Sequence, residues 1–247
     1  MIRDYADYRK IFYDSYLSSQ GEASPEVLGA HLRIRASHCW RILNDFFPAD
    51  RDARILELGC GYGALLHYAM AAGYHDIRGV DNSTEQVAAA HQLGITCAVE
   101  GDCIASLGKE VDNILDAVVS LDLIEHFDKT EACRLAAEVA RTPKPTGRWI
   151  LHCPNGESPF GGRVRYGDFT HELCFTQQSL RQLLHAYGFG RVECFEDGPI
   201  AHGPKSAVRS VLWRVVRFAL RAWLVVETGQ VAETPIFTQN LFCVAYK

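Results

Sequence analysis

Short apolar stretches alternate with longer amphipathic stretches between residues 53 and 196. The short stretches are rich in β-branched residues and have the length of buried strands, whereas the long ones repeat apolar residues at helical spacing. This alternation predicts a parallel sheet whose strands are joined by crossover helices. Strands are expected at 53–58, 76–80, 96–99, 115–120, 147–153 and 190–196, and helices at 64–72, 84–93, 129–140 and 177–187.

Two helices are expected before the first strand. Aromatic and apolar residues recur at helical spacing over residues 4–18, and Pro25 opens a second helix that runs to about Asn44. The aromatic stripe of the first helix is typical of core packing. We therefore interpret residues 1–50 as an N-terminal helical cap and residues 51–247 as the main domain.

The segment 197–236 interrupts the alternation because it holds a basic amphipathic helix. Winding residues 204–226 at 100° per residue gathers the apolar side chains on one arc and the arginines on the opposite arc. The arginines are Arg209, Arg214, Arg217 and Arg221. One interpretation packs the apolar arc against the core and leaves the basic arc in water. The alternatives are a basic face for an anionic substrate or an anionic membrane surface, a lid, or a contact in a homodimer.

Composition and charge argue against several classes of protein. The 247 residues are 48% hydrophobic and 22% charged, as in ordinary globular proteins, and the net charge of −5 argues against a general nucleic-acid binder. The charged N-terminus predicts no secretory signal, and no apolar run has the length of a membrane span, so we expect a cytoplasmic protein. The nine cysteines lack zinc-ligand spacing and are interpreted as small, mostly buried thiols.

The strongest functional signal is a glycine-rich turn after the first expected strand. Gly59, Gly61 and Gly63 let the backbone come close to a ligand at the start of a helix, whose free N–H groups suit an anion. Glu57 precedes the turn, and the second expected strand is followed by Asp81, where doubly wound folds bind ribose hydroxyls. The third glycine comes one residue too early for the dinucleotide fingerprint, which disfavours a nicotinamide oxidoreductase.

The stretch Glu57-Leu-Gly-Cys-Gly-Tyr-Gly63 resembles motif I of the class I S-adenosylmethionine-dependent methyltransferases. The resemblance continues, in order, in Gly79-Val-Asp-Asn-Ser83, Glu100-Gly-Asp102 and the strand that leads into Glu125-His126. It implies a doubly wound, mostly parallel α/β sheet of seven strands, whose last strand, at about 237–246, is antiparallel. It also implies that the N-terminal helices cover the cofactor or shape the substrate pocket, as an alternative to a plain helical layer.

The resemblance implies a role for each matching residue. The glycines would pass close to the methionine part of S-adenosylmethionine, with Glu57 near its amino group. Asp81 would accept both ribose hydroxyls, Asp102 would receive the adenine amino group, and Ser120 would line the sulfonium end. The full set of expected cofactor-binding residues is Glu57, Gly59, Gly61, Gly63, Asp81, Asn82, Asp102, Cys103, Ser120 and Leu121.

The segment Tyr166–Thr176 is similar to a segment of methyltransferases associated with bacterial glycan and O-antigen synthesis. It supplies His171 as the candidate base and Asp168 as a base or an orienting group. We expect a small-molecule or glycan acceptor methylated on oxygen, with a small hydroxylated metabolite as the alternative. A cofactor-binding protein without catalysis is the other open interpretation. No metal is expected.

Overall fold

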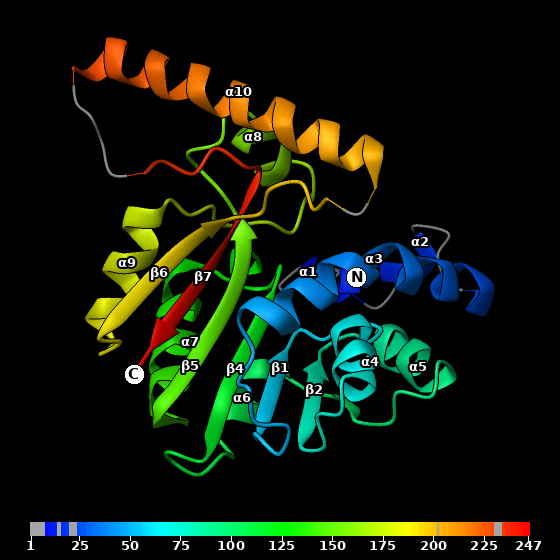
Figure 1. The fold of residues 1–247 in the computed structure, drawn as a ribbon. Coiled ribbons are helices and arrows are strands. Elements are labelled where there is room, and N and C mark those ends of the chain that lie inside the picture. Colours follow the sequence, from blue (N-terminus) through cyan, green and yellow to red (C-terminus); the bar gives the residue numbers. More distant parts are fainter. Residues whose placement is uncertain (1–7, 14–15, 20–23, 202, 230–233) are drawn as a thin grey trace, which may run out of the picture.

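The computed structural model describes residues 8–13, 16–19, 24–201, 203–229 and 234–247. Seven strands form one sheet in the order β3-β2-β1-β4-β5-β7-β6 (Figure 1), and only β7 runs antiparallel to its neighbours among the paired strands described. The predicted doubly wound fold is therefore confirmed, including the antiparallel last strand. The strands are β1 (Ile55–Leu58), β2 (Ile77–Asp81), β3 (Ala98–Glu100), β4 (Leu115–Leu121), β5 (Pro143–Pro154), β6 (Arg191–Glu196) and β7 (Asn240–Tyr246).

Helices cover both faces of the sheet, so the molecule has three layers (Figure 1). One face packs against α3 (Pro25–Asp45), α4 (Ala64–Ala71) and α5 (Thr84–Gln92). The other face packs against α6 (Cys103–Leu107), α7 (Lys129–Arg141) and α9 (Gln177–Ala186). Strands that are buried on both faces of a sheet appear in the sequence as continuous apolar runs, which is why their positions could be predicted.

Local capping fixes the starts of several helices. Ser24 caps α3 ahead of Pro25, and Asp128 and Glu131 form a reciprocal capping box at the start of α7. Thr176 caps α9 in the same way. These caps satisfy N–H groups that the first helical turn leaves without partners.

The N-terminal region differs in detail from the prediction. In place of one helix over residues 4–18, the structure has α1 (Tyr8–Tyr13) and α2 (Tyr16–Ser19), while residues 4–7 and 14–15 lie outside the described residues. Both short helices lie at the carboxyl end of β2, because the Ser83 hydroxyl donates to the Tyr13 carbonyl and Glu85 accepts from the Leu17 amide. The division into a cap and a main domain stays a prediction.

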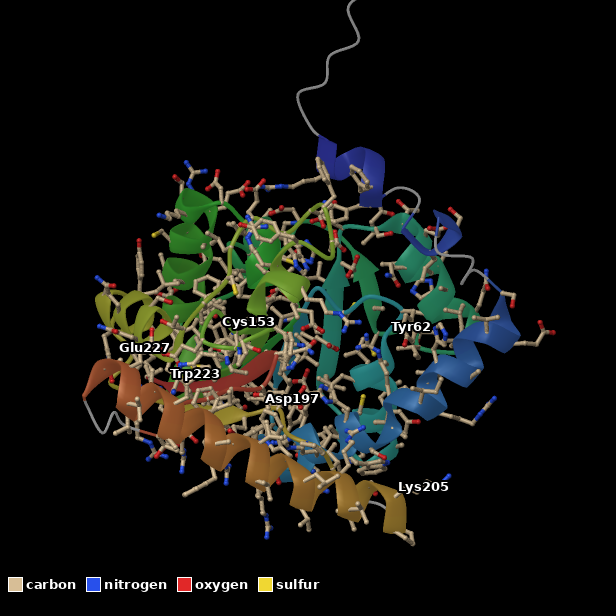
Figure 2. The ribbon with its side chains drawn as sticks, turned by 90° about the horizontal axis from the view of Figure 1, so that it is seen from above. Tyr62, Cys153, Asp197, Lys205, Trp223 and Glu227 are labelled. Atoms are coloured by element: carbon tan, nitrogen blue, oxygen red, sulfur yellow. The ribbon has the colours of Figure 1, made fainter. Side chains whose placement is uncertain are left out.

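The long helix α10 (Pro204–Thr228) confirms the predicted insert but reverses its expected orientation. The interpretation that its apolar arc packs on the core is wrong, because the described residues bury none of its side chains fully and most of its apolar ones are exposed. The side toward the body carries Arg217, which pairs with Glu196 at 2.8 Å, and Ser210, which bonds the Pro199 carbonyl. In the view from above, α10 crosses one side of the molecule between the labelled Lys205 and Glu227 (Figure 2).

None of the helices in the described ranges combines the length and the apolar character needed to cross a membrane.

Candidate functional site

The glycine turn forms at the carboxyl end of β1, beside the point where the strand order reverses between β1 and β4. Gly59, Gly61 and Gly63 all have positive φ, at 68°, 53° and 80°, which only glycine adopts readily. A Cβ on Gly59 would also lie 2.9 Å from the side chain of Leu123. Helix α4 begins directly after the turn, so its first N–H groups face the same region.

Asp81 ends β2 with its carboxylate against the glycine turn. One oxygen accepts from the Gly61 amide at 2.8 Å and the other from the Ser83 amide at 2.9 Å. Burial raises the pKa of Asp81, and the two amide hydrogen bonds oppose that rise. A carboxylate held in this way is fixed in position and still has lone pairs for hydroxyl donors.

Glu57 lies at the root of the turn and is 3% exposed. Its Oε2 has no hydrogen-bond partner among the described residues. Burial, with the nearby charge of Asp81, raises the pKa of Glu57 well above its ordinary range. A buried acceptor without a donor is costly, so this position suits a ligand that brings a cationic donor.

Two adjoining cavities bring the expected cofactor residues together. The first has a volume of about 560 Å³, within the usual range for ligand sites, and includes Asp81, Asn82, Asp102 and Cys103. The second is lined by Glu57 and Leu121 and shares Gly59, Gly61, Gln86 and Asp122 with the first. The orphaned Glu57 carboxylate, the glycine turn and Asp81 thus fit S-adenosylmethionine laid across both cavities.

Three of the predicted residues contribute in other ways. Gly63 lines neither cavity but sets the start of α4. Asp102 lines the first cavity and also caps α6, accepting from the Ala105 amide at 2.7 Å. Ser120 also lines neither cavity, because its hydroxyl is buried and accepts from the Trp149 indole at 2.9 Å.

A chain of hydrogen bonds orients His126 at the edge of the first cavity. Its Nδ1 lies 2.9 Å from the Thr170 hydroxyl, which lies 2.6 Å from an Asp168 oxygen. Burial alone would raise the pKa of Asp168, but hydrogen bonds from Thr170 lower it, so Asp168 is an acceptor. Thr170 therefore donates to Asp168 and accepts from His126 Nδ1–H, which leaves His126 Nε2 with a lone pair. Burial, with His171 nearby, lowers the pKa of His126 to about 4, so the ring is neutral at neutral pH.

His171 packs edge-on against His126, with ring centroids 4.8 Å apart. Its Nδ1 lies 3.0 Å from the carbonyl of Val164 in α8 (Gly161–Arg165). A carbonyl only accepts, so Nδ1 carries the proton and Nε2 has the lone pair, as in His126. The Asp168 carboxylate thus connects through Thr170 to His126, which lines the cavity, while His171 bonds the Val164 carbonyl; the pairing of Asp168 with His171 stays a prediction.

Glu125 completes this group from the short 3₁₀ turn η1 (Ile124–His126). It is buried, its Oε2 has no partner within the described residues, and burial raises its pKa well above the ordinary range. Glu125, His126 and His171 offer ligand atoms that all lie within 4.8 Å of one another, so within the described part of the chain these three form a group that could hold a metal ion. The expectation of no metal stays a prediction.

A charge network that the sequence did not reveal is centred on the buried His152 and includes Asp122, a lining residue of both cavities. His152 of β5, only 2% exposed, is bracketed by Asp122 at 2.6 Å and Asp197 at 3.2 Å. Burial would lower the pKa of His152, but the two carboxylates outweigh it and raise the pKa to about 10. Burial would likewise raise the pKa of Asp122, yet His152 lowers it to about 2. This network fixes Asp122, which lines both cavities and has a positive φ of 51°.

A family model described as a methyltransferase domain matches residues 31–193, about two thirds of the chain. The chain belongs to this methyltransferase family. Membership confirms the activity class that motif I predicted, with S-adenosylmethionine as the methyl donor. The matched residues include the glycine turn, Asp81, Asp102 and the His126–His171 pair.

Individual relatives are more distant. Two Escherichia coli proteins named cyclopropane-fatty-acyl-phospholipid synthase, one of them from strain K12, are 32% identical over 104 residues. That match covers 40% of this chain, and it spans only about a quarter of the length of those relatives.

Solved structures share the fold. A SAM-dependent methyltransferase from Archaeoglobus fulgidus is 22% identical with a TM-score of 0.63, and the match covers 98% of this chain and 100% of that one. A Haemonchus contortus phosphoethanolamine N-methyltransferase in complex with S-adenosyl-L-methionine is 17% identical with a TM-score of 0.64. That match covers 95% of this chain and 60% of the other.

Proposed function

We propose that this methyltransferase methylates a hydroxyl oxygen of a sugar or glycan intermediate. The observation that carries the proposal is His126, which keeps Nε2 unprotonated at the cavity of the cofactor residues and has the ring of His171 packed against it. A sugar hydroxyl is too weak an acid to ionise at neutral pH, so methyl transfer to its oxygen benefits from a positioned base. The similarity of Tyr166–Thr176 to a segment of glycan methyltransferases supports a sugar as the molecule that bears this hydroxyl.

When bound, S-adenosylmethionine supplies a methyl group that is already activated by the sulfonium. The protein's part is to bind and orient. Asp81 would accept hydrogen bonds from the ribose hydroxyls, and Asp102 and Cys103, which line the same cavity, would hold the adenine. Glu57 would accept from the amino group of the methionine part, which would give its unpartnered oxygen a donor. Positioning of this kind can account for much of a rate enhancement.

In this proposal His126 takes the acceptor proton at Nε2. Asp168 and Thr170 hold the ring in the tautomer that leaves this atom free, and they stabilise the imidazolium as it forms. The sequence favoured His171 as the base, with Asp168 as its partner. We now assign His171 to the neighbouring position, where its ring orients His126 or binds the acceptor.

The N-terminal helices supply the wall on the acceptor side. Arg9 and Tyr13 of α1 line the first cavity together with His126 and Phe127. Arg9 is held by Glu131 of α7 at 2.8 Å, so α1 is tied across the cavity to the other side of the sheet. This supports the interpretation that the N-terminal helices shape the substrate pocket.

A second candidate acceptor is the fatty acyl chain of a phospholipid. The specific observation in its favour is the match to relatives named cyclopropane-fatty-acyl-phospholipid synthase. That match covers a quarter of those proteins, so the first proposal keeps preference.

The test is an assay of S-adenosylhomocysteine formation with three classes of acceptor: nucleotide sugars and glycan intermediates, small phenolic metabolites, and phospholipid vesicles. Turnover with the first class, lost in His126→Ala but kept in the surface control His75→Ala, is the expected result. Turnover with phenols or vesicles alone would replace the proposed acceptor. Cofactor binding without turnover on any class would favour a non-catalytic protein.

A further inference from the structure

The outer face of α10 is apolar along its whole length. Its side chains at Val208, Val211, Val215, Phe218 and Val226 project away from the side that carries Arg217 and Ser210. Val215 is 63% exposed, Phe218 74% and Val226 85%. Scattered apolar residues on a surface are ordinary, but a continuous stripe along one helix marks an interaction site.

The charges beside the stripe indicate what covers it. Residues 204–226 contain five Lys and Arg residues and no Asp or Glu, in a chain whose net charge is −5. Lys205, Arg209 and Arg214 are exposed, and on the helical wheel they flank the apolar stripe on its two sides. Long cationic side chains in these positions can reach back to an anionic surface while the stripe enters an apolar layer.

We propose that α10 docks this methyltransferase on the surface of a bilayer that contains anionic phospholipid. The helix would lie in the plane of the interface, with the stripe among the acyl chains and the flanking cations at the headgroups. A second copy of the chain suits this face less well, because pairing the stripes of two α10 helices would bring the flanking cations Lys205, Arg209 and Arg214 of both copies close together.

The docked position is compatible with access to the site. Figure 1 shows α10 on the carboxyl-end side of the sheet, the same end that carries the glycine turn and the cavities. The body-facing contacts of α10 with Glu196 and Pro199 keep its stripe directed outward without any rearrangement of the sheet. This inference goes beyond methyl transfer and does not depend on which acceptor is used.

The experiment is sedimentation of the full chain with vesicles of equimolar phosphatidylglycerol and phosphatidylcholine. Val215→Asp should lower the vesicle partition coefficient at least about tenfold, because it removes a valine from the stripe that would enter the bilayer. Val111→Asp is the matched control, since Val111 has a similar exposure, 69%, in the loop between α6 and β4. Binding of S-adenosylhomocysteine and the unfolding temperature should be the same in both variants, which shows that each is folded.

Charge reversal tests whether the flanking cations contact the anionic headgroups. Arg209→Glu with Arg214→Glu should weaken binding to the anionic vesicles at least about 25-fold, at roughly fivefold for each cation lost. Lys109→Glu with Arg134→Glu, two exposed cations elsewhere, should change it little. Vesicles of phosphatidylcholine alone should bind the unaltered protein weakly.

Three results would overturn the proposal. The first is failure of the unaltered protein to sediment with the anionic vesicles. The second is equal binding by Val215→Asp and Val111→Asp. The third is a dimer, seen by sedimentation velocity without vesicles, that Val215→Asp dissociates while no variant binds lipid; that result would assign the stripe to a second copy of the chain.

Discussion

Replacing Glu57 by glutamine should make the protein more stable and bind its cofactor more weakly. The carboxyl group is buried at the root of the glycine turn, and one of its oxygens has no partner in the described structure. Without ligand, the charged form is therefore a cost to the fold. With ligand, the same charge becomes the acceptor for the amino group of the methionine part. The amide of glutamine keeps the shape and removes the charge.

The substitution should lower the affinity for the cofactor and raise the stability of the fold. Hydrogen bonds to charged groups contribute about 1 to 1.5 kcal/mol more than neutral ones, so S-adenosylmethionine should bind about five- to tenfold more weakly. Relief of the buried charge should add at least about 1 kcal/mol of stability at neutral pH. For a domain of this size that raises the unfolding temperature by about 2–4 °C.

The gain in stability should depend on pH. Burial raises the pKa of Glu57 above its ordinary value of 4.5, so the carboxyl is protonated at no cost below that value in both the folded and the unfolded state. As the pH rises above 4.5, the unfolded chain ionises first and the wild-type fold loses stability. The difference between Glu57→Gln and the wild type should therefore vanish near pH 4.5 and grow toward neutral pH.

Calorimetric titration and thermal unfolding of the free protein measure the two effects. Glu227→Gln, at an exposed position at the end of α10, is the control for a lost negative charge. 5′-Methylthioadenosine, which lacks the amino-acid part of the cofactor, should bind Glu57→Gln as well as the wild type. If Glu57→Gln lowers the unfolding temperature, or weakens both ligands equally, Glu57 supports the turn and does not face the amino group.

The remaining predictions concern other parts of the site. Asp81→Ala should weaken S-adenosylmethionine binding by about 2–4 kcal/mol in calorimetry, because it removes acceptors for two hydroxyl donors; unchanged affinity would remove Asp81 from the ribose site. His126→Ala should lower turnover about 10²–10⁴-fold with cofactor affinity intact, and His171→Ala should lower it less. Wild-type turnover should fall as the pH drops through about 4, where His126 becomes charged; turnover that stays constant through that range would remove His126 as the base. His152→Asn should cost about 1–3 kcal/mol of stability near pH 6, because it removes the charge-assisted hydrogen bonds to Asp122 and Asp197. That cost should shrink as the pH rises from 6.5 through about 10, where the wild type loses the imidazolium charge; a constant cost in thermal unfolding would refute the charged histidine. Chelation by EDTA should leave turnover unchanged, and a loss restored by zinc would assign a metal to Glu125 and its neighbours.

The sheet and the cofactor loop were predictable because their signals are local. Each strand is a compact apolar run, and the glycine turn and Asp81 stand at fixed offsets from the strands that hold them. Short helices such as α6 and α8 were missed, because five residues are too few to show a periodicity. Ser120 was assigned to the cofactor site by its place in a motif. Only the structure shows that its hydroxyl instead accepts a hydrogen bond from Trp149 on the neighbouring strand β5.

The charge network and the histidine pair depend on contacts between distant segments. His152 looks like one polar residue in an apolar strand, and the sequence separates it from Asp122 by 30 positions and from Asp197 by 45. The bond between His126 and Thr170 spans 44 positions. The pair Glu125-His126 was visible as a family motif, but its role was not, because the segment that orients it lies beyond a strand and an irregular loop.

Helix α10 shows a different limit of sequence reasoning. Periodicity gave its two faces correctly but not which face points inward, because that depends on the surface beneath it. That surface offers the Glu196 carboxylate and the Pro199 carbonyl, which are acceptors, so the helix turns its donors, Arg217 and Ser210, toward the body. An arginine paired with a carboxylate at 2.8 Å satisfies both charges, whereas valines in the same place would leave Glu196 without that partner. The apolar arc is then exposed as a consequence of polar complementarity below it, and an exposed apolar arc flanked by cations is the feature that the bilayer proposal explains.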